Sequence, residues 1–259
     1  MIYGNLDKQK FLKELIEKNV SPILVTGPEG VGKFSFLKEY LNSKKIEKNF
    51  IDSDNKILKI ETARYLVSLS HKKSDKRIIL INDAHKFEVY SQNTFLKTLE
   101  ETLSETIFIL ITYQENKILP TIRSRSVKVK FSFIEKEETE KILKDKGFLD
   151  KDINLALNFY PYQPGKALRF LNFKKYVIIN KLISSVEIDF EELKNINDPK
   201  EFLEYYILSL RNDLLKNLNN KQFIYSKIKH IKNCLNLYYD FSYNLNFNLQ
   251  IANLVLNNG

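Results

Sequence analysis

Residues 22–33 read PILVTGPEGVGK, a short apolar stretch followed by closely spaced glycines and a lysine. The apolar part, bounded by Pro22 and Gly27, predicts a buried strand. The next segment, GKFSFLKEYL, predicts a helix. A strand, a glycine-rich loop and a helix in this order are typical of a phosphate-binding loop, because successive backbone N–H groups converge on a phosphate and the lysine reaches its outer oxygens. The residues assigned to this loop are Gly27, Gly30, Gly32 and Lys33.

Two further apolar stretches, RIILIND at 77–83 and TIFILIT at 106–112, predict buried strands. Strands that are apolar on both faces and separated by helical patterns indicate a parallel sheet covered by helices, an α/β fold. Beyond this region the sequence changes to amphipathic helical patterns with few strand candidates. We therefore predict three domains: a P-loop parallel-sheet domain at 1–134, a small helical lid at 135–172 and a C-terminal all-helical domain at 173–259.

The composition excludes several classes of protein. The chain has 259 residues, 43% of them hydrophobic, so a disordered or collagen-like chain is excluded. A single cysteine, Cys234, excludes a disulfide scaffold and fits a reducing cytoplasm. The N-terminus is polar and no apolar run is long enough to span a bilayer, so we expect neither a signal peptide nor a membrane helix. The net charge of +9, most of it in residues 1–134, suggests a polyanionic partner.

The nucleotide motifs are degenerate. A phosphate loop normally has a hydroxyl directly after its lysine, because that hydroxyl ligates Mg²⁺. Here the position is Phe34, and Ser35 comes one residue late. An active ATPase usually has Asp then Glu after the second strand, whereas this chain has Asn82 and Asp83. The sequence therefore predicts a loop that cradles phosphate without hydrolysing ATP.

The segments that follow carry a family resemblance. Two segments resemble parts of clamp-loader AAA+ subunits. SQNTFLKTLEE at 91–101 resembles their N-x-L-L-K-x-L-E-E helix. TIFILITYQENKILPTIRSRS at 106–126 resembles their sensor strand and the arginine segment that follows it. With GPEGVGK upstream, the resemblance covers residues 1 to about 172. The degraded nucleotide site is most similar to that of the delta-prime type of subunit of bacterial DNA polymerase III. The matching helix residues are Asn93, Leu96, Lys97, Leu99, Glu100 and Glu101.

The resemblance implies roles for particular residues. Arg125, in Ser124–Arg125–Ser126, corresponds to the arginine that reaches the γ-phosphate bound by a neighbouring subunit. Thr112 corresponds to the first sensor of the γ-phosphate, and the second sensor's arginine aligns with Gly165. The resemblance implies nucleotide-binding residues that either bind nucleotide weakly or are vestigial. They are Gly27, Gly30, Gly32, Lys33, Asp83 and Thr112.

The resemblance also implies cofactors and partners. Many clamp-loader ATPase subunits carry a four-cysteine zinc module near residues 42–77, but this segment has no cysteine, so we expect no zinc and no other metal. No cofactor is required, and ATP or ADP is expected to bind weakly. The implied partners are the ATPase subunits and delta in a hetero-pentamer, and through this assembly the sliding clamp and primer-template DNA, without a membrane.

The implied function is that of a non-hydrolysing, stator-like subunit that presents Arg125 to a neighbouring ATPase subunit during clamp loading. Two alternatives stay open at this point. One is an ATP-hydrolysing clamp-loader subunit that uses Ser35 and Asp83 with a rearranged metal shell. The other is a P-loop protein outside replication, such as a kinase or a DNA-binding scaffold.

Two other patches are interpreted as structural. The basic cluster HKKSDKR at 71–77 is expected to be a solvated loop, since base readout needs more than charge. The tyrosines and phenylalanines of the C-terminal part, such as Tyr205 and Tyr206, are expected to be core and interface residues.

Overall fold

The computed structural model describes residues 4–53, 57–70, 76–100, 106–172, 199–239 and 250–251. The chain falls into two compact units, each described by itself below: residues 1–147 with 161–166, and residues 148–160 with 167–259. The domain boundaries expected from the sequence stay a prediction. Residues 173–198 of the expected C-terminal domain lie outside the described residues.

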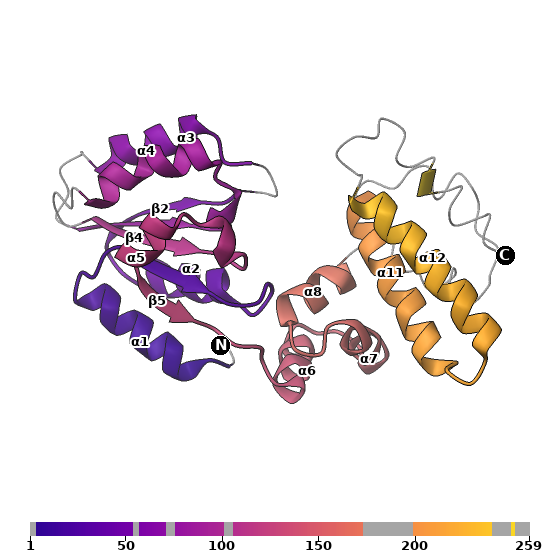
Figure 1. Ribbon diagram of the computed structural model, residues 1–259. Coiled ribbons are helices and arrows are strands. Elements are labelled where there is room, and N and C mark those ends of the chain that lie inside the picture. The colour runs from indigo at the N-terminus through magenta and orange to yellow at the C-terminus, as the bar shows by residue number, and fades with distance from the viewer. Residues whose placement is uncertain are drawn as a thin grey trace. The chain divides into compact units, whose positions relative to one another are not determined.

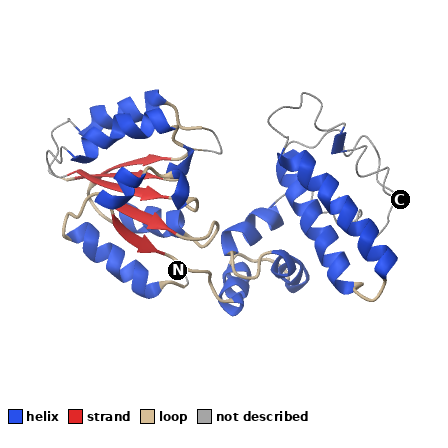
Figure 2. Cartoon of the chain, viewed as in Figure 1, coloured by secondary structure: helices blue, strands red, loops and turns tan. Residues whose placement is uncertain are grey.

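A parallel sheet forms the centre of the first unit, with helices on both of its faces (Figure 2). Its strands lie in the order β2-β3-β4-β1-β5, and every pair is parallel. Because the carboxyl ends of the strands share one edge, the loops that follow β1, β3 and β4 lie along that edge. The strands are β1 (Ile23–Thr26), β2 (Glu47–Ile51), β3 (Arg77–Ile81), β4 (Thr106–Ile111) and β5 (Val127–Lys130).

The central strands are apolar on both faces because each strand contributes to two cores. Ile23 and Val25 of β1 pack in one core with α1 and α2. Leu24, between them, packs in the other core with α3 and α5. Figure 1 shows α3 and α4 on one side of the sheet and α1 on the other. The helices of this unit are α1 (Leu6–Glu17), α2 (Lys33–Asn42), α3 (Ile60–Ser70), α4 (Val89–Glu100), α5 (Pro120–Arg125) and α6 (Lys136–Asp145).

The sequence predicted the three central strands but not the two edge strands, β2 and β5. Both edge strands are rich in charge, with the sequences EKNFI and VKVK, and most of their residues are at least partly exposed. A sheet edge is commonly protected by charged side chains, which hide the apolar signal of a strand.

Arg77 has a structural role, so the prediction that the whole basic cluster at 71–77 is a solvated loop is wrong for this residue. Its side chain is 2% exposed, and it pairs with Glu47 across β2 and β3 through two bonds, from Nε at 2.9 Å and from Nη2 at 2.8 Å. Arg77 also donates to the carbonyl of Leu69 at the end of α3. This arginine is therefore part of the fold and not of a solvated loop; residues 71–75 lie outside the described residues.

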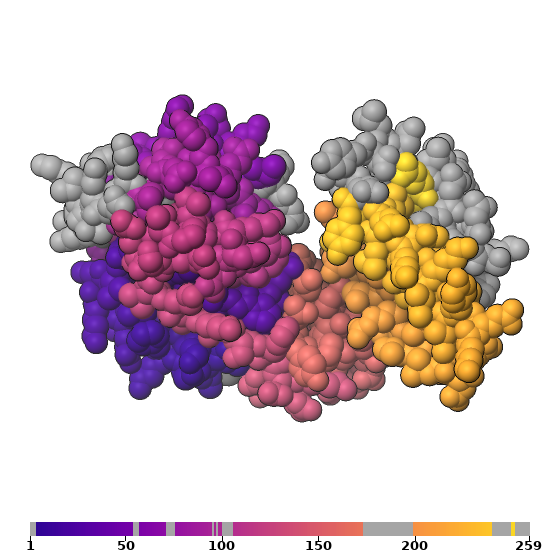
Figure 3. Space-filling view, in the orientation of Figure 1, coloured from indigo at the N-terminus to yellow at the C-terminus, as the bar shows by residue number. Residues whose placement is uncertain are grey.

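The second unit is helical in its described part, which confirms the predicted fold class. Tyr205 packs against Phe170 with ring centroids 5.0 Å apart, and the buried Tyr206 hydroxyl lies 2.9 Å from Nε2 of His230. Helices α11 and α12 pack against each other, and Figure 3 shows the orange surface of α11 next to the yellow surface of α12. No helix within the described ranges is long and apolar enough to cross a membrane. The helices are α7 (Asp150–Phe159), α8 (Pro164–Asn172, shared with the first unit), α11 (Pro199–Lys216) and α12 (Lys221–Tyr239).

Candidate nucleotide site and arginine segment

The loop between β1 and α2 has the backbone that a phosphate-binding loop needs. Gly27 has φ +129°, and a Cβ there would lie 2.3 Å from the carbonyl oxygen of Phe131, so only glycine fits. Gly30 and Gly32 also have positive φ, at +77° and +87°. Gly32 directly precedes α2, whose first N–H groups have no intrahelical partner and are available to an anion.

Lys33 is turned onto its own loop. Its Nζ donates to the carbonyl oxygen of Gly27 at 2.8 Å and also to that of Pro28. The residue is 6% exposed, and burial lowers the pKa of Lys33 to about 8, although Glu29 and Asp83 favour its charged form. The ammonium is therefore held by main-chain oxygens of the loop.

The lowered pKa of Lys33 predicts a pH dependence of stability. Between pH of about 8 and 10.5 the unfolded chain binds more protons at this group than the folded chain, so the free energy of unfolding rises with pH. Relative to Lys33→Met, wild type should gain up to about 3 kcal/mol across this window. Urea unfolding of both proteins at several pH values measures the difference, and a difference independent of pH would contradict the buried ammonium.

The positions beside the loop do not fit a magnesium ion. Phe34 packs on the core beneath α2, with Nζ of Lys38 5.6 Å from its ring centroid, and Ser35 is exposed. Asn82 donates from Nδ2 to Oδ1 of Asp52 at 3.1 Å. A hydroxyl and a carboxylate normally hold the ion in such sites, and neither stands at these two positions. Among the described residues there is also no group of three or more His, Cys, Asp or Glu side chains that is able to hold a metal ion.

Asp83 lies after β3 and is engaged by its own chain. Its Oδ2 accepts a hydrogen bond from Oγ of Ser53 at 3.0 Å and pairs with Nζ of Lys86 at 3.1 Å. Its φ of +51° is a left-handed conformation that Asp tolerates better than most residues. The carboxylate therefore has a partner hydroxyl and a counter-ion, and it acts on Lys33 through its charge.

Thr112, after β4, is 1% exposed. Its hydroxyl accepts the Gln114 N–H at 2.9 Å and lies 3.2 Å from Nδ1 of His85. Burial lowers the pKa of His85, which favours the neutral form of the ring. The hydroxyl expected to sense a γ-phosphate is thus engaged in contacts within the chain.

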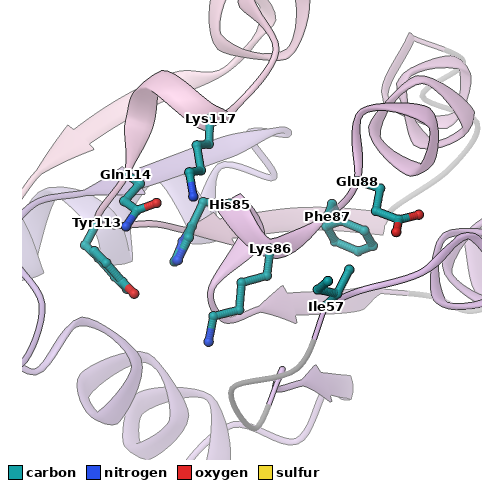
Figure 4. Close-up of a pocket in the computed structure, with 8 residues that line it drawn as sticks. All are labelled: Ile57, His85, Lys86, Phe87, Glu88, Tyr113, Gln114 and Lys117. Atoms are coloured by element: carbon teal, nitrogen blue, oxygen red, sulfur yellow. The ribbon is translucent and has the colours of Figure 1, made fainter. Parts of the chain in front are cut away.

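A pocket of about 320 Å³ opens beside His85 (Figure 4). Its walls come from the β2–α3 connection, from the 3₁₀ helix η1 (Ala84–Lys86) with the residues after it, and from the connection that follows β4. Tyr113 packs edge-on against His85, with ring centroids 4.2 Å apart. The lining residues are Ile57, His85, Lys86, Phe87, Glu88, Tyr113, Gln114 and Lys117.

Arg125 is the last residue of α5 and is exposed. Its Nη1 donates to the carbonyl oxygen of Thr121 at 3.2 Å. In the register of the sheet, Val127 lies beside Ile23, so Arg125 precedes β5 at the amino edge, whereas the phosphate loop follows β1 at the carboxyl edge. Four strand residues separate the two edges, roughly 13 Å along the strand. The structure thus gathers the loop, Asp83 and Thr112 at one edge and puts Arg125 at the other.

Three residues that the sequence did not assign to the site contact the phosphate loop from residues 161–166. The N–H of Gly165 donates to the carbonyl oxygen of Gly30 at 2.7 Å. Nε2 of Gln163 donates to the carbonyl oxygen of Glu29 at 2.9 Å, and Nζ of Lys166 lies 3.3 Å from the Glu29 carboxylate. The one signal in the sequence was the glycine at the position of the second sensor arginine.

Comparisons with known proteins agree with these motifs. Residues 37–135 match the family model described as DNA polymerase III, delta subunit. DNA polymerase III subunit delta' from Pseudomonas aeruginosa is 38% identical over 52 residues, which are 20% of this chain and 16% of that protein, so the match spans well under two thirds of the relative. The replication factor C small subunit from Thermoplasma volcanium is 27% identical, with 76% of this chain and 73% of the relative covered.

A solved structure shares the fold over nearly the whole chain. It is a DNA polymerase III gamma subunit-related protein from Thermotoga maritima, with a TM-score of 0.59, 19% identity and coverage of 97% of this chain and 98% of that chain. The family model, the sequence relatives and this fold agree with one another. The chain is thus similar to clamp-loader subunits in these segments, and it has the fold of a DNA polymerase III gamma subunit-related protein.

Proposed function

We propose that this chain is a non-hydrolysing, delta-prime type subunit of a replicative clamp loader, and that it supplies Arg125 to the ATPase site of a neighbouring subunit. The observation that carries the proposal is the position of Arg125, exposed at the end of α5 on the sheet edge opposite the chain's own phosphate loop. A guanidinium exposed at this position lies where the surface of a neighbouring subunit would meet it. Supplied in trans, it stabilises the charge that develops on the transferred phosphoryl group.

The chain's own site supports a role without hydrolysis. Phe34 offers no oxygen to a metal ion, and the Asp83 carboxylate is already paired with Lys86. The glycine loop and Lys33 are intact, so weak binding of ATP or ADP is compatible with the site, while no cofactor is required. We propose that this subunit stays rigid while its neighbours change with their nucleotides.

The proposed partners follow from the similarity to clamp-loader subunits. They are the ATPase subunits and delta, in a hetero-pentamer that places the sliding clamp on primer-template DNA in the cytoplasm. The excess of basic residues in the first 134 positions adds weakly to the attraction of this assembly for DNA.

Hydrolysis by the isolated chain tests the proposal. With MgATP, purified wild type is expected to release phosphate no faster than Lys33→Ala, because the residues that hold the metal ion are missing. A coupled phosphate-release assay makes this comparison. The second candidate is an ATP-hydrolysing clamp-loader subunit, because the glycine loop is intact. Turnover in wild type that Lys33→Ala abolishes would favour this candidate.

Assembly tests the remaining alternative, a P-loop protein outside replication. The chain is expected to co-elute with cognate clamp-loader ATPase subunits and delta in gel filtration. Failure to co-elute, together with unchanged clamp loading when the chain is omitted, would contradict a role in replication.

A further inference from the structure

The contacts between residues 163–166 and the phosphate loop form a clasp, which we define by Gln163, Gly165 and Lys166 on one side and Glu29 and Gly30 on the other. All of these residues belong to the first unit. Two hydrogen bonds and one ion pair join the two sides. The carbonyl oxygens of Glu29 and Gly30 accept the two hydrogen bonds of the clasp. Earlier in the loop, the carbonyl oxygens of Gly27 and Pro28 accept hydrogen bonds from Lys33.

The two glycines allow the backbones to approach more closely than any other residue would. A Cβ added at Gly165 would lie 2.9 Å from the carbonyl oxygen of Gly30 and 3.0 Å from its Cα. A Cβ added at Gly30 would in turn lie 2.9 Å from the backbone nitrogen of Lys166. Because the opposing atoms are backbone on both sides, neither contact is relieved by rotation of a side chain.

We propose that this clasp holds the phosphate loop folded without a nucleotide, so that ATP and ADP do not control the conformation of the loop. In a nucleotide-dependent loop, bound phosphate supplies much of the hydrogen bonding that orders the backbone. Here the chain's own residues supply hydrogen bonds to Glu29 and Gly30, and the close approach of Gly30 leaves no room for a side chain at position 165. The inference deepens the proposed function and rests on it in one respect: a subunit without hydrolysis needs no nucleotide cycle to order its loop.

The test is Gly165→Ala in the isolated full chain, followed by thermal unfolding and by hydrogen exchange of the amides at 27–33. Gly165 lies in the first turn of α8 and does not have positive φ, so at an unconstrained site the change to alanine would raise the melting temperature. The clasp predicts the opposite sign, a lower melting temperature together with faster loop exchange. ADP added to wild type should leave the loop exchange unchanged.

Gln163→Ala is the second variant, because it removes one hydrogen bond without adding an atom. It should speed exchange at 27–33 roughly two- to tenfold, the effect of one net hydrogen bond, and it carries the test if Gly165→Ala does not fold. Gly147→Ala is the matched control: its φ of +84° strains alanine, but nothing lies within 4 Å of the new Cβ. It should lower the melting temperature and leave exchange at 27–33 unchanged.

Two results would overturn the clasp. One is a higher melting temperature for Gly165→Ala with unchanged loop exchange in both clasp variants. The other is a loop in wild type whose exchange is slowed by ADP. Neither measurement involves Arg125 or a neighbouring subunit, so failure of the clasp leaves the arginine proposal standing, and a silent Arg125→Ala leaves the clasp standing.

Discussion

Arg125→Ala is expected to lower ATP hydrolysis at the neighbouring subunit's site by about 10³-fold or more in the reconstituted clamp loader, because an arginine supplied in trans contributes a factor of this size. The side chain is exposed at the end of α5, so the free energy of unfolding should change by no more than about 0.5 kcal/mol. Single-turnover hydrolysis in the presence of clamp and primed DNA measures the effect at one site, which steady-state turnover of several sites would dilute.

Two variants make the result specific. Arg123→Ala removes a partly buried arginine from the same helix, and it should leave the neighbour's rate close to that of wild type. Arg125→Lys keeps the charge but loses the planar fork of donors, so it should recover only part of the rate. The proposed role of Arg125 would be contradicted if Arg123→Ala and Arg125→Ala lowered the neighbour's hydrolysis rate equally, or if neither variant lowered it.

Gly27→Ala is expected to lower the free energy of unfolding by about 3 kcal/mol or more. The φ of +129° strains any other residue by about 1–3 kcal/mol. The new Cβ would also meet the backbone oxygen of Phe131 at 2.3 Å, and overpacking of this kind costs about 1–3 kcal/mol more. Urea unfolding of the isolated chain measures the sum.

Gly147→Ala separates the two contributions to the Gly27 effect. Its backbone is also left-handed, with φ +84°, but its added Cβ has open space, so it should cost only the strain of about 1–2 kcal/mol. If Gly27→Ala destabilises the chain no more than Gly147→Ala does, the close approach between the phosphate loop and Phe131 is wrong.

The fold was predictable where the chain had to bury both faces of a strand. Residues 23–26, 77–81 and 106–111 are almost wholly apolar because the side chains of each strand pack in two cores. The edge strands Glu47–Ile51 and Val127–Lys130 were not predictable in this way, since they are partly exposed and charged. Their place in the sheet comes from pairing with a neighbouring strand, which local sequence does not express.

The candidate site was predictable as a set of residue types. The glycine spacing of the loop is a local backbone requirement, and the loss of a metal ligand at Phe34 follows from chemistry alone. What each polar group contacts was not predictable: Asp83 accepts a hydrogen bond from Ser53, and the Thr112 hydroxyl lies beside His85. These partners are set by how the ends of different strands meet.

The sequence by itself therefore determined the local chemistry of the loop: its glycines, its lysine and its missing hydroxyl. Backbone freedom and metal ligation depend on residue type, so they can be predicted from a short motif. Only the tertiary structure decided that Arg125 lies on the edge opposite its own loop and that Gly165 touches Gly30. In both cases the two segments are about a hundred or more residues apart in the sequence. Their relative positions in space are set by sheet register and packing, which no short motif contains.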